Sequence, residues 1–303
     1  MTAAELTADD DPPTLELHAL GVRRAGTALL AGLSLSSRAG RLGLIGDWSG
    51  LFQALTGQAE LAAGTARAFG CPWEHALARG SVGFAPCDPA LPLSFTITEY
   101  LRHAARLSHG SAARAAHDTQ QVLETYGLGP FAQHKLSQLV TYQRRALGIA
   151  CAALGAPPVV CLETPVRGLD AEAADYIVRL CSVAAQQSRV IVSCGVPSSP
   201  SAERSLLEGC AELFWLERGA LLSQGSPAEV FAPGLRYSLT VKGAQVAAFS
   251  AALTEAGCRL RERTGPGSYW VELPEHSSTD LLLDAALRAD LVVLELEPLF
   301  EAH

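Results

Sequence analysis

Residues 42–57 form a short apolar strand, a glycine-containing turn and a helix-like stretch. The turn is Gly46-Asp47-Trp48-Ser49-Gly50, and Leu51-Phe52 follows it. A strand that passes through a glycine loop into a helix is the arrangement of a phosphate-binding loop, whose backbone N–H groups hold phosphate oxygens. Such a loop also needs a lysine and a metal-binding hydroxyl directly after its last glycine. Here the glycines are one residue too close and no lysine follows, so the segment predicts that fold without its chemistry.

The composition is that of a globular chain. Its 303 residues are 49% hydrophobic, enough for one large or two unequal domains. The net charge of −8 argues against a nucleic-acid-binding surface, which needs clustered basic residues. Residues 1–14 are acidic and lack the apolar core of a signal peptide, so we expect a disordered tail. No stretch approaches the roughly 20 apolar residues of a membrane-spanning helix, so membrane association would require a partner.

Cysteine and histidine give no sign of a metal centre. The eight cysteines contain no C-x-x-C pair, and several lie inside apolar runs. This favours buried free thiols in a reducing compartment over a redox pair of Cys87 and Cys194. The eight histidines show no metal-ligand spacing, so no metal site is predicted.

Strands and helices alternate through residues 15–232. Short apolar runs at 159–162 and 189–193 suit buried parallel strands, with a crossover helix at 171–185 between them. Residues 96–155 have apolar positions at helical spacing and predict a helical block. Further strands are expected at 15–20, 29–37, 42–45, 64–69, 82–85, and in a hairpin of 212–216 and 221–224 around Arg218-Gly219. The pattern predicts a doubly wound α/β domain.

A second unit is expected over residues 235–303, after a linker near Ala232-Pro233-Gly234. Its predicted order is strand–helix–strand–strand–helix–strand, the split βαβ pattern of a small ferredoxin-like α+β domain. The expected elements are 237–241, 245–256, 258–263, 268–273, 279–289 and 291–296. Gly265-Pro266-Gly267 suits the hairpin between the middle strands.

The segment Val159–Asp170 resembles the region of ATP-binding cassette (ABC) ATPases that runs from an apolar strand through D-E-P to G-L-D. Residues Arg218–Glu229 are similar to the family ending R-G-x-L-x-x-x-G-x-P-x-E. The resemblance covers residues 15 to about 230. It implies the ABC-type P-loop NTPase fold, with a doubly wound sheet, an antiparallel β subdomain and a helical subdomain. Residues 235–303 are similar to the appendage of some export-type ABC ATPases.

The resemblance identifies Gly46, Ser49 and Gly50 as the remnant of the phosphate loop, in which Asp47 adds a negative charge. Ser49 is expected to cap the following helix rather than to bind metal. Glu163 stands where the family has the carboxylate that holds Mg²⁺, although it could also be an ordinary surface or salt-bridged carboxylate.

Other family positions are substituted. Thr164 replaces the catalytic glutamate, and a threonine hydroxyl cannot act as a general base. Cys87 replaces the glutamine that senses the γ-phosphate and touches the permease, and Gly195 replaces the histidine that contacts the γ-phosphate. The family signature L-S-G-G-Q corresponds to a remnant in which the serine and both glycines are replaced: Leu139, Val140, Thr141, Tyr142 and Gln143.

Gly168, Leu169 and Asp170 stand at the family's dimer interface, although Asp170 also suits the cap of the helix after it. Losing the lysine, the metal-binding hydroxyl and the histidine would remove on the order of 5 kcal/mol of nucleotide binding. We therefore expect no resident cofactor, with ATP and Mg²⁺ as the open alternative, and no hydrolysis.

The resemblance implies a degenerate subunit of an ABC export complex on the inner face of the cell membrane. It would dock on a permease through residues 87–98 and the helical block. It would form a homodimer, or a heterodimer with an intact ABC ATPase, through the faces around Gly46 and Gly168–Asp170. Two alternatives remain: an active ATPase that uses Glu163 for the metal, and a scaffold of a membrane machine outside transport.

Overall fold

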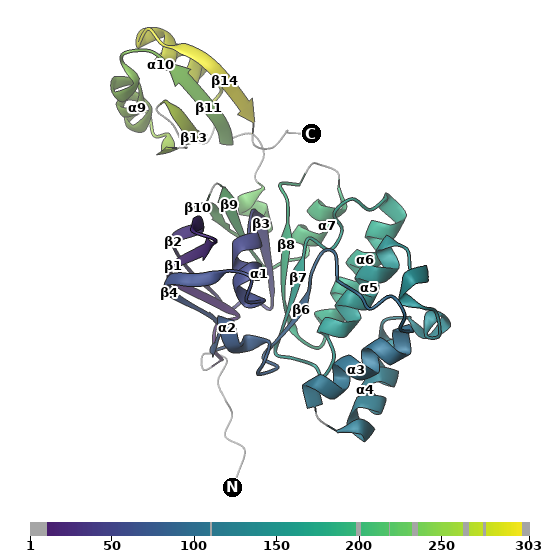
Figure 1. The fold of residues 1–303 in the computed structure, drawn as a ribbon. Helices are drawn as coiled ribbons and strands as arrows, with labels where there is room; N and C mark the ends of the chain where they lie inside the picture. Colours follow the sequence, from purple (N-terminus) through teal and green to yellow (C-terminus); the bar gives the residue numbers. More distant parts are fainter. Residues whose placement is uncertain are drawn as a thin grey trace, which may run out of the picture. The chain divides into compact units, whose positions relative to one another are not determined.

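The computed structural model describes residues 11–109, 111–197, 201–217, 219–231, 236–262, 267–274 and 277–298. The chain divides into two compact units, residues 1–227 and 228–303, which are described separately (Figure 1). The expected linker at 232–234, the first ten residues of the tail, and Arg218 and Gly265-Pro266 of two expected turns lie outside the described residues.

A six-stranded sheet organises the first unit, in the order β10-β9-β3-β8-β7-β6. All neighbours are parallel except the β9–β10 hairpin. The strands are β3 (Arg41–Gly46), β6 (Val82–Ala85), β7 (Val159–Glu163), β8 (Arg189–Cys194), β9 (Glu212–Glu217) and β10 (Ala220–Gly225). The near-continuous buried runs of β3, β7, β8 and β9 suit strands that are covered on both faces. The expected parallel strands are confirmed.

Helices follow four of these strands: α1 (Ser49–Leu55) follows β3, α6 (Ala171–Ala184) follows β7, α7 (Ala202–Glu208) follows β8, and α8 (Pro227–Val230) follows β10 and begins at the last residue of the first unit. Two more helices are α2 (Trp73–Ala76), which precedes β6, and α5 (Thr141–Ala152), which precedes β7. Helices α5 and α6 lie side by side (Figure 1). Helix α6 buries residues at helical spacing, including Ala173, Ile177, Leu180 and Ala184, which fixes the face that it turns to the core.

An antiparallel sheet packs beside the phosphate-loop segment, in the order β2-β1-β4-β5. Its strands are β1 (Leu15–Arg24), β2 (Thr27–Ser37), β4 (Glu60–Ala68) and β5 (Cys71–Pro72). One hydrophobic core joins this sheet to α1 and β3, through Leu20, Leu44, Leu51 and Phe52. The apolar side chains that flank the loop after β3 are therefore packed in this core, while Asp47 in the loop itself is exposed.

The helical part of the first unit contains α3 (Ile97–His109), α4 (Ala112–Thr125), η1 (Gly129–Phe131) and η2 (Leu136–Gln138), and it ends with α5. Helices α3 and α4 pack against each other (Figure 1). The chain returns to the start of α3 through η2, because Leu136 N–H donates to Phe95 O at 2.8 Å. In the described residues, the expected helical block thus consists of the α-helices α3, α4 and α5 and the short 3₁₀ helices η1 and η2.

The second unit has its own sheet and core. Its elements are β11 (Arg236–Lys242), α9 (Val246–Glu255), β12 (Arg259–Glu262), β13 (Ser268–Glu272), α10 (Asp280–Arg288) and β14 (Val292–Pro298). The strands are antiparallel in the order β12-β13-β11-β14. Leu239, Val271, Phe249, Leu253 and Leu282 fill the space between sheet and helices. The element order follows the split βαβ pattern.

The expected tail differs from the structure at residues 11–14. Thr14 is fully buried, and its hydroxyl donates to Ala39 O at 2.8 Å. Arg189 binds Thr14 Oγ1 at 2.9 Å and Asp11 Oδ2 at 2.6 Å. The tail prediction is wrong for these four residues, because a guanidinium far away in the sequence holds them.

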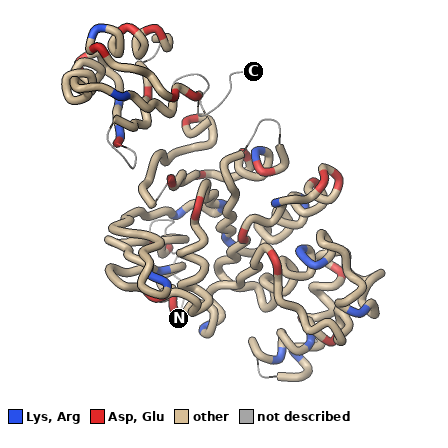
Figure 2. Tube along the Cα trace, turned by 45° about the horizontal axis from the view of Figure 1, so that its top comes forward, with Lys and Arg blue, Asp and Glu red and all other residues tan. Residues whose placement is uncertain are grey.

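The eight cysteines are free thiols, and all except the half-buried Cys151 are buried. Burial raises the pKa of the Cys194 thiol well above its usual value. A thiol that stays protonated is a poor nucleophile, which agrees with a packing role. Figure 2 shows Lys and Arg interspersed with Asp and Glu along the described parts of both units.

Candidate functional site

The carboxyl ends of three neighbouring parallel strands meet at one edge of the six-stranded sheet. β3 ends at Gly46, β8 at Cys194 and β7 at Glu163. The register pairs Ile45 with Cys194 and Glu163 with Ser193, so these ends lie level with one another. Ligands of open α/β sheets bind at this edge. The structure therefore brings the phosphate-loop remnant, defined as residues 46–50, close to the substituted strand-end positions.

The two glycines of the loop remnant are explained by packing. Gly46 has φ +95°, and a Cβ built on it would lie 1.9 Å from Leu216 O of β9. Gly50 is buried in the first turn of α1, where a Cβ would lie 2.9 Å from Leu29 Cβ of β2. Glycine serves such close approaches because it has no side chain and tolerates positive φ. Both glycines are required by the fold whether or not a phosphate binds.

The carboxylate of Asp47 accepts hydrogen bonds from polar groups within the loop itself. Its Oδ1 accepts a hydrogen bond from the backbone N–H of Ser49 at 3.0 Å and from the Ser49 hydroxyl at 2.6 Å. The N-cap of α1 is Trp48, without a side-chain cap. The expectation that Ser49 caps this helix is wrong, because the neighbouring carboxylate captures its hydroxyl. A carboxylate oxygen thus occupies hydrogen-bond donors that a phosphate would use.

The side chain of Trp48 is buried beneath the loop. It is 1% exposed, and its indole Nε1–H donates to Ile45 O at 2.9 Å. Its backbone carbonyl accepts from Leu51 N at 3.0 Å and from Phe52 N at 3.4 Å, closing the first turn of α1. The Phe52 ring then stacks on Phe84 of β6 with centroids 5.6 Å apart. The sequence reasoning gave Trp48 no role, although a tryptophan inside a glycine turn is an unusual residue to place near phosphate.

Glu163 and Cys87 come together in the structure. The backbone N–H of Cys87 donates to Glu163 Oε2 at 3.4 Å. Glu163 is half-buried at the end of β7, and Cys87 is buried. The carboxylate therefore stands at the expected strand end, held by the backbone of the segment that follows β6.

Thr164 is strained and carries an unpaired hydroxyl. Its φ is +41°, and a β-branched residue adopts positive φ only at a cost of about 1–3 kcal/mol. Its backbone N–H donates to Ser193 O at 3.1 Å and Ser193 Oγ at 3.2 Å, while its own Oγ1 is buried without a partner. Gly195, beyond β8, is exposed with no atom within 4 Å of a built Cβ, so packing does not require glycine there.

The signature remnant, residues 139–143, is also bound within its own chain. Leu139 is buried and its carbonyl accepts from Arg144 Nε at 2.9 Å. Val140 is 53% exposed, and its N–H donates to Gln143 Oε1 at 3.1 Å. Thr141 is exposed as the first residue of α5, and the Tyr142 ring meets Tyr176 of α6 edge to face.

The segment after Thr164 is positioned by a buried arginine that sequence reasoning missed. Arg145 of α5 is 7% exposed, and its Nη1 donates to Pro165 O at 3.1 Å. Gly168 has φ +68°, and Leu169 N–H donates to Val166 O at 3.2 Å. The contact of Arg145 with Pro165 O could not be predicted, because a single arginine in a helix does not indicate which carbonyl it will bind.

Asp170 begins α6 as the sequence suggested. Its Oδ1 accepts from Ala173 N at 2.9 Å, which satisfies one of the free N–H groups of the first turn. The capping role is confirmed. The role of Gly168, Leu169 and Asp170 in a dimer stays a prediction.

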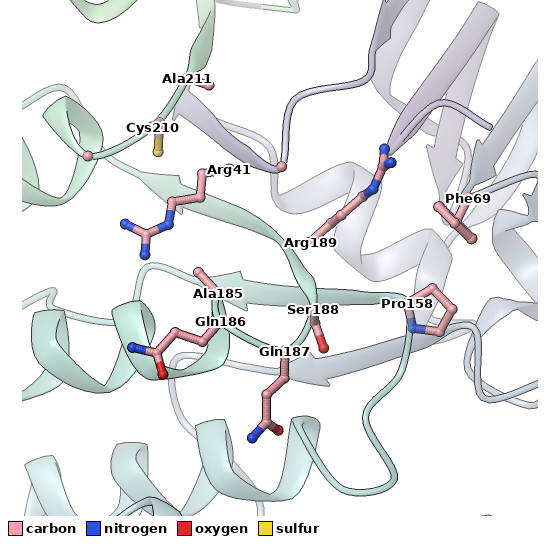
Figure 3. Close-up of a pocket in the computed structure, with 12 residues that line it drawn as sticks. Arg41, Phe69, Pro158, Ala185, Gln186, Gln187, Ser188, Arg189, Cys210 and Ala211 are labelled. Carbon is pink, nitrogen blue, oxygen red and sulfur yellow. The ribbon is translucent and has the colours of Figure 1, made fainter. Parts of the chain in front are cut away.

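A broad groove of about 750 Å³ lies away from these residues (Figure 3). Its lining includes Arg41 and Arg189, the first residues of β3 and β8, and Pro158, which precedes β7. It is therefore at the amino ends of the strands, opposite the edge where ligands of such sheets bind. In Figure 3 Arg189 extends toward Phe69, whose ring centroid lies 5.1 Å from its guanidinium carbon. Because Arg189 also holds Asp11 and Thr14, we assign it a structural role.

Within the described ranges, no three His, Cys, Asp or Glu side chains are grouped so as to hold a metal ion. None of the helices in the described residues combines the length and apolar composition that crossing a bilayer requires.

Comparisons with known proteins agree on one kind of protein, although no protein-family model matches the chain. It is 30% identical over 181 residues to Nod factor export ATP-binding protein I of Paraburkholderia xenovorans, covering 59% of this chain and 58% of that protein. The corresponding protein of Ralstonia nicotianae is 29% identical over 226 residues, covering 72% and 68%.

Among solved structures, the chain is similar to cbiO1 from Clostridium perfringens, described as part of the ABC transporter complex cbiONQ. The TM-score is 0.62 at 20% identity, covering 74% of this chain and 92% of that one. A structure described as the ATP binding subunit of an ABC transporter gives a TM-score of 0.60 at 20% identity, with coverages of 72% and 91%. These likenesses show the expected ABC-type P-loop NTPase fold. By sequence relatives and by fold, the chain is similar to the ATP-binding proteins of ABC transporters, and it spans 58% of the length of the Paraburkholderia xenovorans relative.

Proposed function

We propose that this chain is a degenerate, non-hydrolysing ATP-binding-type subunit of an ABC export complex. The observation that carries the proposal is the contact of Asp47 with the N–H and the hydroxyl of Ser49. A phosphate that approached these donors would have to displace a carboxylate and would then lie beside its charge. Trp48 fills the space beneath the loop, so the loop cannot relax inward to make room.

The strand-end positions support the same conclusion. Hydrogen bonds to charged groups contribute about 1.5–3 kcal/mol each, and the loop remnant offers no lysine to a phosphate. Phosphoryl transfer depends on positioning and on charge stabilisation. Thr164 and Gly195 supply neither a base nor a cation at the ends of β7 and β8.

An active ATPase with a non-standard site is the second candidate, and Glu163 is the observation that favours it. Its half-buried carboxylate stays at the end of β7, where the family holds Mg²⁺, with only a long contact to Cys87 N. Carboxylate oxygens are suitable Mg²⁺ ligands. Nucleotide binding and phosphate release separate the two candidates.

We expect the purified full chain to show no saturable binding of labelled ATP with Mg²⁺ at micromolar concentrations, and phosphate release at background level. Asp47→Asn keeps an acceptor for Ser49 N–H and removes the charge, so it tests repulsion alone. We expect this variant to remain without micromolar binding, because the lysine is still missing. The active ATPase would be established instead if the full chain bound ATP at micromolar concentrations and released phosphate, and if Glu163→Ala abolished the phosphate release.

The proposed partner is a membrane-embedded permease, contacted through residues 87–98 and the helical part. Two exposed apolar side chains support this surface: Leu93 is 55% exposed and Val140 is 53% exposed. The segments that carry them are joined, because Ser137 N–H donates to Leu93 O at 3.2 Å. Exposed apolar side chains on neighbouring segments are a common feature of partner surfaces.

Leu93→Arg should remove most of the full chain from the membrane fraction of its native cells, because a guanidinium would then enter an apolar contact. The measurement is quantitative detection of the chain in washed membranes. Leu287→Arg, at a side chain that is 79% exposed on α10 of the second unit, is the matched control and should leave the distribution unchanged. Equal membrane retention of the two variants would exclude this docking surface.

A dimer, with an identical chain or an intact ABC ATPase, is proposed through the faces around Gly46 and Gly168–Asp170. A scaffold outside transport remains the third candidate. Purification of the complex from membranes distinguishes them, since a permease that copurifies in fixed proportion supports transport, and a membrane partner of another kind supports the scaffold.

A further inference from the structure

A pocket of about 430 Å³ opens beside α5 and α6 and the segment that follows α4. Aromatic rings form much of its wall, with Phe131 from η1, Tyr142 from α5 and Tyr176 from α6. Ala146 and Ala173 also line it and leave room between the helices. Small-molecule sites have volumes of about 300–1,000 Å³ and combine aromatic walls with a few polar groups. The pocket shares Tyr142 and Gln143 with the signature remnant and Asp170 with the proposed dimer face, and no residue of the phosphate-loop remnant lines it.

The tyrosine rings are held in place by the chain itself. Tyr142 and Tyr176 meet with centroids 5.8 Å apart and planes at 85°, forming an aromatic corner. The Tyr176 hydroxyl donates to Tyr126 O at 3.5 Å. Burial and the neighbouring Tyr142 raise the pKa of Tyr176 above its usual value, so its phenol is neutral at physiological pH. A ligand would therefore meet uncharged ring faces that are already positioned, which lowers the cost of ordering them.

Charged groups surround the aromatic corner. Asp170 and Glu172 at the start of α6 line the pocket, and Arg179 lies further along the same helix. The guanidinium carbon of Arg179 is 6.0 Å from the centroid of Tyr176, at the outer limit of a cation–π contact. The chain thus already places a cation over one of these rings. The two carboxylates and the one guanidinium give the pocket lining a net negative charge.

We propose that this pocket binds an organic cation of the alkylammonium class. Methylated ammonium groups are attracted to the faces of aromatic rings and are recognised by aromatic cages. The alkyl groups would contact Ala146 and Ala173, and the carboxylates of Asp170 and Glu172 would attract the charge at short range. An anion in the same space would meet both carboxylates.

The test is isothermal titration calorimetry of the purified full chain at low ionic strength. The probes are (2-hydroxyethyl)trimethylammonium and its neutral isostere, in which carbon replaces the charged nitrogen. The cation should bind about threefold to thirtyfold more tightly than the isostere, the range expected of cation–π attraction. Equal affinity of the two probes, or no binding of either, would overturn the proposal.

Three variants and one control variant then locate the site. Tyr142→Ala removes one wall of the corner and should abolish most of the cation's advantage, while Thr141→Ala changes the exposed neighbouring residue and should have no effect. Glu172→Gln should weaken binding of the cation and Arg179→Gln should strengthen it, each by a few fold. Both residues are exposed, so these two variants decide the outcome even if Tyr142→Ala disturbs α5. If the affinity of both charge variants for the cation were unchanged, or changed in the reverse direction, this pocket would be excluded as the binding site.

Discussion

Gly46→Ala is expected to destabilise the first unit by roughly 2–6 kcal/mol, because two separate costs meet at this residue. A non-glycine residue at φ +95° carries backbone strain of about 1–3 kcal/mol. A methyl group built 1.9 Å from Leu216 O must also push β3 and β9 apart, and overpacking of this kind costs about 1–3 kcal/mol. The measurement is urea unfolding of the full chain, followed by tryptophan fluorescence.

Gly57→Ala is the matched control. Gly57 is exposed with φ +72°, and nothing lies within 4 Å of a built Cβ, so this variant carries strain without the clash. We expect it to cost only this strain, about 1–3 kcal/mol, and therefore less than Gly46→Ala. Equal losses of unfolding free energy in the two variants would mean that a methyl group on residue 46 does not clash with Leu216 O. In that case the glycine could still be read as a residue kept for phosphate.

Much of the fold could be predicted from local pattern. The apolar run Val82–Ala85 has the same bounds as β6, and Asp170 caps α6 as expected. Both signals are contained in a few consecutive residues. Helix α7 (Ala202–Glu208) was missed, because its seven residues give too short a repeat to show helical periodicity. The burial of Thr14 could not be predicted, since Arg189 holds it from 175 positions away in the sequence.

At the site, the sequence predicts which groups are absent but not what the structure places there instead. The predicted absence of a lysine, a histidine and a catalytic glutamate rests on the residues at Gly46–Gly50, Gly195 and Thr164, and it stays a prediction. The bonds of Asp47 to Ser49 and the positive φ of Thr164 depend on the backbone conformation, which no motif encodes. The same holds for Trp48, whose indole fills the loop through packing between two sheets.

Trp48→Ala is expected to cost about 3–5 kcal/mol of unfolding free energy, the range for truncating a buried aromatic side chain. The variant leaves a cavity beneath the loop remnant and removes the hydrogen bond to Ile45 O. Trp48→Phe keeps most of the apolar volume and loses the N–H donor. We expect it to cost about 1–2 kcal/mol, mainly that of a hydrogen bond. Urea unfolding, with far-ultraviolet circular dichroism as the signal, measures both without depending on the altered fluorophore.

The Trp48 variants also test whether the loop is a packing element or a closed nucleotide site. If the indole alone excludes phosphate, Trp48→Ala should gain ATP binding as it loses stability. We expect the loss of stability without the gain, because Asp47 still occupies Ser49 N–H and no lysine has been added. A loss below about 1 kcal/mol would show that the loop does not depend on the indole. Stability lost without ATP binding would instead mean that the segment after β3 contributes to this chain through its packing between the two sheets.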